Sequence, residues 1–275
     1  MTPFAKLTGL AIMGAVSALI FVGGLSAQTR RLENKVAPLS RQEANQRWTE
    51  FSRESRMADY CMSFTLEHIP RKGAETKRKG FIFGKQLGNT AFTRIVFDAD
   101  SGGKEFLLEN SPDNQRVWKF ENGKLEEIKK SDWTKPFFNG CIYAPFDLLV
   151  PYRNWPVSYA GPDRIGQAVH YFDARSESFP DFKVRVALTR EFNSPAQTQI
   201  LGPNDEPIKT LSLGSIKKID NVWLMLELSM RDESSRDKDK LIFTRGNLTI
   251  KNPAEIFRPE SLGKMLDIPK LKNFR

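Results

Sequence analysis

The sequence has few of the side chains from which most active sites are built. Its 275 residues include two cysteines, Cys61 and Cys141, and two histidines, His68 and His170, which all lie far apart along the chain. A structural zinc site needs four closely grouped ligands, so we expect no metal site. HExxH and GxSxG motifs are absent, and no nucleophile can be matched to a neighbouring base. The sequence therefore predicts a protein that is not an enzyme, with no catalytic residues and no cofactor.

Two segments imitate ligand-binding loops. Residues 98–109, DADSGGKEFLLE, place acidic residues or glycine at the first, third, sixth and twelfth positions of a calcium loop. Gly102 stands at the fifth position, where an oxygen ligand is needed, and the flanking residues are typical of strands, so we expect a hairpin turn. Residues 161–166 have the glycine spacing of a phosphate loop, but Gln167 replaces the required lysine.

Positive charge is in excess but dispersed. The formal net charge is +9, and the basic residues fall in short groups at 30–31, 77–79, 129–130 and 217–218. A nucleic-acid-binding surface would concentrate them on one face and interleave aromatic residues, so we expect no nucleic-acid partner. Solvated turns and strand edges account for this pattern, and weak attraction to anionic lipid surfaces is compatible with it.

The N-terminus has the features of a secretory signal. Lys6 is followed by the uncharged run 7–25, and Ser26 and Ala27 supply small residues for cleavage after residue 27. The uncharged run is also long enough to remain as an inner-membrane anchor. Either outcome predicts a periplasmic body, 28–275, with one domain. Export permits a disulfide between Cys61 and Cys141, and two buried free thiols are the alternative.

One helix is expected ahead of a long series of strands. Ser40 and Glu43 have the spacing of a capping box for a helix over 41–57. Its apolar stripe comprises Ala44, Trp48 and Phe51. The period then changes to two, and the expected strands are 60–69, 77–87, 91–98, 104–109, 115–121, 124–129, 165–175, 182–191, 196–202, 208–219, 222–231 and 239–250.

The strand over 222–231 shows the pattern on which the fold prediction depends. Every second residue of this strand is apolar, and the residues between them are polar from Glu227 onward, as in a sheet with one buried face. The apolar positions are Val222, Leu224, Leu226, Leu228 and Met230. The charged run 232–240 is too polar to pack, so we expect an exposed loop there. So many short strands predict a mainly β fold with short helices (α+β), built on one large antiparallel sheet that curls into a half-open or nearly closed barrel.

The segment 131–156 interrupts the strand pattern. It contains prolines at 136, 145, 151 and 156 and seven aromatic residues, with a short helix expected over 146–150. An apolar, irregular segment between two blocks of sheet is suited to cover a concave face. The alternative is a crossover loop that fills the core without touching a ligand.

The chain resembles a known family, and the region of about 135–260 carries most of the match. The resemblance is carried by RVWKF at 116–120, FNGCIYAPFDLL at 138–149, GPDRIGQAVHYFDA at 161–174, IKKIDNVWLMLELSMRD at 216–232 and LIFTRGNLTI at 241–250. These segments resemble those of bacterial outer-membrane lipoprotein-sorting proteins, which are similar to the LolA and LolB periplasmic carriers. The resemblance implies a half-open barrel with a helical lid that holds lipoprotein acyl chains.

The expected function is a periplasmic carrier that sequesters acyl chains for outer-membrane lipoprotein sorting. The alternative is a sensory or structural module that binds a protein of the cell envelope. We expect a monomer whose partners are lipoprotein acyl chains or another lipid. The candidate cavity residues are Phe81, Phe83, Trp118, Phe120, Leu224, Leu226 and Leu228, and the candidate lid residues are Trp48, Phe51, Phe146, Leu148 and Leu149.

Processing of the N-terminus can be tested directly. We predict that the mature chain begins at Gln28, because Ser26 and Ala27 provide the small residues that precede a cleavage site. N-terminal sequencing of the protein from a periplasmic fraction measures this. Recovery of the full-length chain exclusively with membranes would show that the segment is retained as an anchor.

Overall fold

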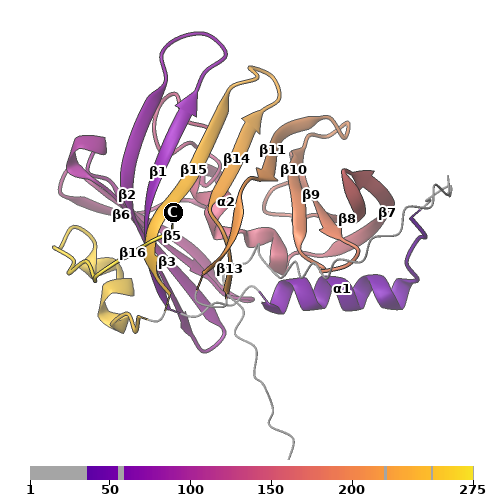
Figure 1. The fold of residues 1–275 in the computed structure, drawn as a ribbon, viewed down its shortest axis with the longest axis horizontal. Helices are drawn as coiled ribbons and strands as arrows, with labels where there is room; N and C mark the ends of the chain where they lie inside the picture. Colours follow the sequence, from indigo (N-terminus) through magenta and orange to yellow (C-terminus); the bar gives the residue numbers. More distant parts are fainter. Residues whose placement is uncertain (1–35, 55–58, 220–221, 249, 275) are drawn as a thin grey trace, which may run out of the picture.

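The computed structural model describes residues 36–54, 59–219, 222–248 and 250–274 (Figure 1). The predicted signal segment 1–27, the end of the predicted helix at 55–57 and residues 220–221 between two predicted strands lie outside these residues. Among the described residues, none of the helices combines the length and apolar character needed to cross a membrane.

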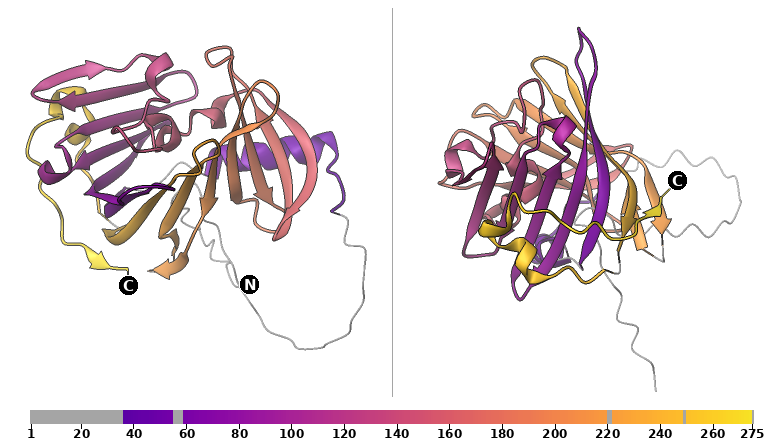
Figure 2. Two further views of the ribbon diagram at one scale, coloured as in Figure 1. Left: turned by 90° about the horizontal axis from the view of Figure 1, so that it is seen from above. Right: turned by 90° about the vertical axis from the view of Figure 1, so that its left-hand side faces the viewer.

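A large antiparallel sheet dominates the structure. Its strands are β1 Tyr60–Ile69, β2 Thr76–Leu87, β3 Thr90–Phe97, β4 Glu105–Asn110, β5 Gln115–Glu121, β6 Lys124–Glu127, β7 Val157–Ile165, β8 Gln167–Ala174, β9 Lys183–Thr189, β10 Pro195–Leu201, β11 Pro207–Leu213, β14 Glu227–Asp232, β15 Lys238–Asn247 and β16 Lys272–Asn273. The order of these 14 strands is β6-β5-β4-β3-β2-β1-β15-β14-β11-β10-β9-β8-β7, with β16 beside β15. The sheet curls but stays open between β6 and β7 (Figure 2), which confirms the predicted half-open form.

Two of the predicted strands are broken by a bend. In place of 208–219 and 222–231, β11 is followed by β12 Ile216–Ile219, and β13 Val222–Met225 precedes β14. The short pair β12–β13 forms a sheet of its own. Across the bend, the Gly214 N–H donates to the Glu227 carbonyl and the Leu226 N–H donates to the Ser215 carbonyl. Backbone hydrogen bonding therefore continues from the large sheet into the short pair.

The edge strand β7 was not predicted from the sequence. Gly161 and Pro162 lie within it and are more typical of a turn. At a sheet edge, a proline removes a backbone donor that has no neighbouring strand to bind, so it is tolerated. A register shift between Tyr159 and Gly161 also bends the strand.

The segment 98–109 forms a hairpin turn, as predicted. Residues Ala99–Ser101 form the 3-10 helix η1, and Gly102 follows with a φ of 103°, which L side chains rarely adopt. The charged run 232–240 differs from its prediction, because β15 begins inside it and buries Asp239 completely.

The helix α1, Arg41–Glu54, begins with the predicted capping box. The Ser40 N–H donates to the Glu43 carboxylate (2.8 Å), and the Glu43 N–H donates to the Ser40 hydroxyl (3.3 Å). The stripe of Ala44, Trp48 and Phe51 is buried. Trp48 packs against Phe172 of β8, so the helix covers the concave face on the β7–β10 side of the sheet (Figure 1).

The C-terminal segment covers the outer face of the sheet on the side of β1–β5 (Figure 2). This segment includes the 3-10 helices η4 Ala254–Phe257 and η5 Pro259–Ser261. Beneath it, Arg94 of β3 is fully buried, forms an ion pair with Glu105, and donates to the carbonyls of Ile256 and Ser261. A guanidinium that satisfies backbone carbonyls in this way fixes the segment to one position on the sheet.

A second buried ionic group fastens the segment that covers the inner face. Asp239 of β15 is 0% exposed, and its Oδ2 accepts the N–H groups of Ile142 (2.7 Å) and Tyr143 (3.1 Å). The Cys141 thiol lies 3.1 Å from the same oxygen, and His68 Nδ1 lies 2.7 Å from Oδ1. One carboxylate thus joins two strands of the sheet to residues 141–143.

The two cysteines are free thiols in the structure, so the predicted disulfide is wrong and the alternative of two buried thiols holds. Cys61 belongs to the cluster on the outer face, whereas Cys141 belongs to the core on the inner face. Burial raises the pKa of Cys61 to about 12 and also raises the pKa of Cys141, whose thiol lies beside Asp239. Both groups therefore stay protonated and unreactive near neutral pH.

We predict that Asp239→Ala lowers the free energy of unfolding by about 3 kcal/mol. The substitution leaves two buried N–H groups without an acceptor, and each costs about 1–3 kcal/mol. Urea titration followed by tryptophan fluorescence measures the change. The exposed Asp181→Ala is the matched control and should stay within about 0.5 kcal/mol of the original protein. Equal stability of Asp239→Ala and Asp181→Ala would contradict the role of this carboxylate.

Candidate functional site

A cavity of about 180 Å³ lies between the concave face of the sheet and a cover made of three short pieces. The cover consists of the C-terminal end of α1, the helix α2 Pro145–Leu149 and the 3-10 helix η3 Pro151–Asn154. The predicted short helix at 146–150 is α2, and it lies inside the curl of the sheet (Figure 2).

The sheet side of the cavity is largely apolar. Leu211 and Leu213 alternate along β11, and Leu213 is paired in register with Leu228 of β14. The apolar side chains on this wall are Ile82, Leu108, Leu211, Leu213, Met225, Leu228 and Phe243. They come from six different strands, so the wall depends on the curl of the sheet as a whole.

The local sequence makes the cover compact. Pro145 occupies the first turn of α2, where its missing N–H is not needed, and the Asp147 carboxylate accepts the Ala144 N–H (2.8 Å). Val150 ends the helix with a φ of 53°, and Pro151 then starts η3 in a new direction. The chain can therefore present both α2 and η3 to the same cavity.

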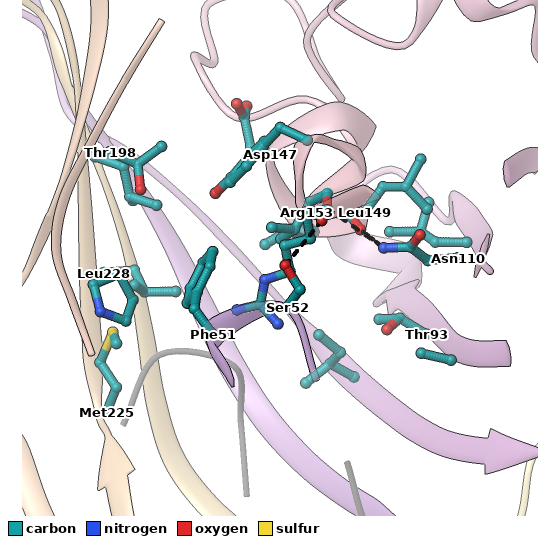
Figure 3. Close-up of a pocket in the computed structure, with 18 of the residues that line it drawn as sticks. Phe51, Ser52, Thr93, Asn110, Asp147, Leu149, Arg153, Thr198, Met225 and Leu228 are labelled. Carbon is teal, nitrogen blue, oxygen red and sulfur yellow. Dashed lines mark hydrogen bonds between the residues drawn. The ribbon is translucent and has the colours of Figure 1, made fainter. Parts of the chain in front are cut away.

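Side-chain hydrogen bonds attach α2 and η3 to the sheet and to α1. Asn110 Nδ2 at the end of β4 donates to the Leu149 carbonyl (2.6 Å), and the Ser52 hydroxyl of α1 donates to the Arg153 carbonyl (3.0 Å) (Figure 3). One bond holds α2 from the sheet, and the other holds η3 from α1.

The cavity wall also contains charged groups. The guanidinium of Arg153 lies over the Phe51 ring, with 4.5 Å between Cζ and the ring centroid, and burial lowers its pKa to about 10. Burial raises the pKa of Asp147, and this is opposed by Lys209, whose Nζ lies 3.9 Å from the carboxylate. Lys85 lies at the edge of the cavity and forms an ion pair with Asp59 at 2.8 Å.

The structure brings part of the predicted site together. One predicted cavity residue, Leu228, lines the cavity. So do three predicted lid residues, namely Phe51, Leu148 and Leu149. Four further predicted residues belong to the core on the same face of the sheet without lining the cavity, namely Leu224, Leu226, Trp48 and Phe146.

Four predicted cavity residues lie on the other face of the sheet. Phe83 and Trp118 belong to the outer cluster, and Phe81 and Phe120 pack against it under the C-terminal segment. The prediction that these four residues line the cavity is therefore wrong, and the reason is physical. Period-two alternation shows which residues share a face of a strand, but both faces of this sheet are apolar and both are covered.

Sequence reasoning missed the polar residues of the cavity, above all Asp147 and Arg153. A signal was present, because these two residues carry the sole charges between Lys135 and Asp163, in a segment otherwise rich in aromatics and proline. Asn110 and Thr198 gave no comparable signal. Among the described residues, no group of three or more His, Cys, Asp or Glu side chains is placed to hold a metal ion.

No protein-family model and no curated protein sequence matches the chain. Solved structures do match. A putative outer-membrane lipoprotein-sorting protein domain from Vibrio parahaemolyticus is 15% identical with a TM-score of 0.65, and the match covers 80% of this chain and 94% of that domain. A DUF1329 family protein from Desulfovibrio piger is 13% identical with a TM-score of 0.69, over 80% of this chain and 98% of that protein.

A LolA superfamily protein from Nitrosomonas europaea is 14% identical with a TM-score of 0.62, and the match covers 82% of this chain and 100% of that protein. Identities this low establish the fold and leave the ligand open. Over about four fifths of its length, the chain therefore has the fold of the outer-membrane lipoprotein-sorting domain and of the LolA superfamily protein, as the sequence resemblance predicted.

Proposed function

We propose that the protein is a carrier of the cell envelope that shields the hydrocarbon chain of a lipid or lipoprotein in the cavity under α2 and η3. The apolar cavity between the concave face and its cover is the observation that carries this proposal. The fold supports it, because one protein with the same fold is described as a putative outer-membrane lipoprotein-sorting domain. The cargo of this protein would accordingly be lipoprotein acyl chains or another lipid.

The size of the cavity limits what fits in this form of the protein. Its volume of about 180 Å³ exceeds that of an engineered apolar cavity of about 150 Å³ that holds benzene in another protein. Benzene has six carbons, so by this comparison the cavity holds on the order of six methylenes. Burying them contributes about 5 kcal/mol before ordering costs, which suits a cargo that must be released again.

We infer that a complete acyl chain takes up more room and that α2 and η3 move outward to admit it. The attachments of the cover suggest how this occurs. Asp239 holds Ile142 and Tyr143 at the start of the segment, deep in the core. Beyond them, the hydrogen bonds from Asn110 and Ser52 are two that hold α2 and η3. Outward movement of α2 and η3 would have to break these bonds together with those from Gln115 to the Pro151 carbonyl (3.2 Å) and from Asn154 to Asn110 (2.9 Å).

We further propose that the protein acts in the periplasm as a monomer. The uncharged run 7–25 supports export, with the segment 1–27 either removed after Ala27 or kept as an inner-membrane anchor. In both cases the cavity faces the compartment through which exported lipoproteins pass.

Binding of an acyl probe tests the carrier function. We predict that the delipidated protein binds a fluorescent probe with one saturated chain and an uncharged head, and that binding saturates. Leu213→Glu should weaken this binding at least about tenfold, because a carboxylate in the apolar wall must lose water when the chain enters. Leu213 is half-buried, so the carboxylate can remain solvated in the empty protein. Fluorescence titration gives the dissociation constants.

The matched control is Ile208→Glu on the same strand. Ile208 is 40% exposed and does not line the cavity, so its substitution should change the affinity by less than about twofold. If folded, delipidated protein binds no acyl probe, the carrier function is wrong and a module that binds an envelope protein becomes the better account. Equal losses in both variants would show that the probe binds outside the cavity.

A further inference from the structure

Basic side chains that lie far apart in the sequence meet at one surface of the folded protein. The segment 264–274 runs along the outside of the sheet and ends beside the short pair β12–β13 (Figure 2). There the Lys217 amino group of β12 donates to the Phe274 carbonyl (2.8 Å), and the Asn247 amide of β15 donates to the Lys270 carbonyl (3.4 Å). We call this area the basic surface. Its basic residues, all exposed, are Lys217, Lys218, Arg245, Lys264, Lys270 and Lys272.

The positive charge of the basic surface exceeds the negative charge beside it. Elsewhere on the sheet, basic side chains are paired, as Lys77 is with Glu67 at 2.7 Å. In the part of the chain that the structure describes, no carboxylate forms an ion pair with Lys217, Lys218, Arg245, Lys264 or Lys270. Asp267 is the one acidic residue in the segment 264–274. The basic surface therefore carries a local positive potential that an anionic partner would neutralise.

Exposed aliphatic side chains accompany these cations. Met265 is fully exposed, Ile216 is 41% exposed and Ile268 is 37% exposed. They are three of the six large apolar side chains that are exposed among the described residues, and none of the six is aromatic. Proteins that bind single-stranded nucleic acid stack bases on aromatic side chains, so this surface does not suit that partner. Cations together with exposed aliphatic groups suit the boundary of a lipid bilayer, where phosphates lie above hydrocarbon.

The basic surface adjoins the wall of the cavity. Ile216 of β12 is paired in register with Met225 of β13, and Lys217 is paired with Leu224. Met225 lines the cavity, and Leu224 belongs to the core on the concave side of the sheet. A partner bound at β12 is therefore one strand away from the cavity wall.

We propose that the basic surface docks the protein on a bilayer of anionic phospholipid, with the lysine and arginine side chains on the lipid phosphates and Met265 at the edge of the hydrocarbon. Each basic residue close to an anionic bilayer increases the affinity about fivefold, and salt screens this attraction. Binding of this kind is strong enough to hold the protein at the membrane and weak enough to release it. It does not depend on what the cavity carries.

Sedimentation with lipid vesicles tests the docking of the protein recovered from the periplasmic fraction. One set of vesicles is phosphatidylcholine alone, and in the other about one third of the lipid is phosphatidylglycerol. At about 0.1 M salt the protein should bind the anionic vesicles at least about tenfold tighter than the neutral ones. At about 1 M salt, where charges are screened beyond about 3 Å, this difference should disappear.

Charge reversal locates the surface that binds. The double variant Lys218→Glu with Lys270→Glu should weaken binding to the anionic vesicles at least about twentyfold, because two attractions become repulsions. The matched control is Lys72→Glu with Lys129→Glu, which changes the net charge equally at exposed positions outside the basic surface. The control should lose less than about threefold, since charges farther from the bilayer than a Debye length are screened.

A neutral substitution separates contact with hydrocarbon from attraction by charge. Met265→Ser leaves the net charge unchanged and should weaken binding to the anionic vesicles at least about threefold, because the methionine side chain is lost from the edge of the hydrocarbon. Leu125→Ser is the matched control, because Leu125 is 43% exposed on the edge strand β6, and its affinity should equal that of the original protein.

Three results would overturn the proposal. If the original protein binds neither set of vesicles, or binds both equally at about 0.1 M salt, the basic surface does not dock on anionic lipid, and an acidic protein becomes the better partner for it. Equal losses in the two double variants would show that net charge, and not this surface, determines binding. An unchanged affinity of Met265→Ser would overturn the contact with hydrocarbon. Each of these results leaves the acyl-binding test of the cavity unaffected.

Discussion

A sheet that curls without closing keeps two faces, and in this protein both faces carry large apolar side chains. Removing this apolar surface from water stabilises the folded protein by about 25 cal/mol for every Å² that is buried. The outer face is covered by the C-terminal segment, which the buried Arg94 fixes through the carbonyls of Ile256 and Ser261. The inner face is covered by α1 and by the irregular segment that contains α2 and η3. The position of the cavity follows from this second cover.

The two covers are fastened by buried ionic groups, and the cavity described above lies beneath the inner one. Under the C-terminal segment lies a buried apolar cluster that includes Phe83, Leu107 and Trp118. On the inner face, Asp239 fixes the base of the cover, but the five-residue helix α2 and the turn into η3 leave the cavity open beneath them. The left-handed φ of Val150 turns the chain from α2 into η3 above this space, and we regard this turn as the feature that leaves room for a ligand.

Much of the fold was predictable because its local signals agree with one another. The bounds predicted for β1 and β5 match those in the structure, and the Ser40–Glu43 capping box placed the start of α1. The sequence did not reveal which face of β2 points into the cavity, because its phenylalanines alternate just as cavity residues would. These phenylalanines lie on the outer face, where a segment almost 180 residues later covers them. Asp239 stands in a charged run that is typical of an exposed loop. Its burial becomes favourable because it binds Ile142, about 100 residues away, and His68, about 170 residues away. Such long-range pairing leaves no local pattern in a sequence.

The central claim is that a hydrocarbon chain occupies the space between the concave face and its cover. Photo-crosslinking with a saturated acyl chain that carries a diazirine near its end tests this most directly, with the labelled residues mapped by mass spectrometry. The account predicts labels on Leu213, Met225 and Leu228, competed away by unlabelled lipid. Labels confined to the outer cluster around Phe81 and Trp118, or spread over the surface without competition, would contradict it.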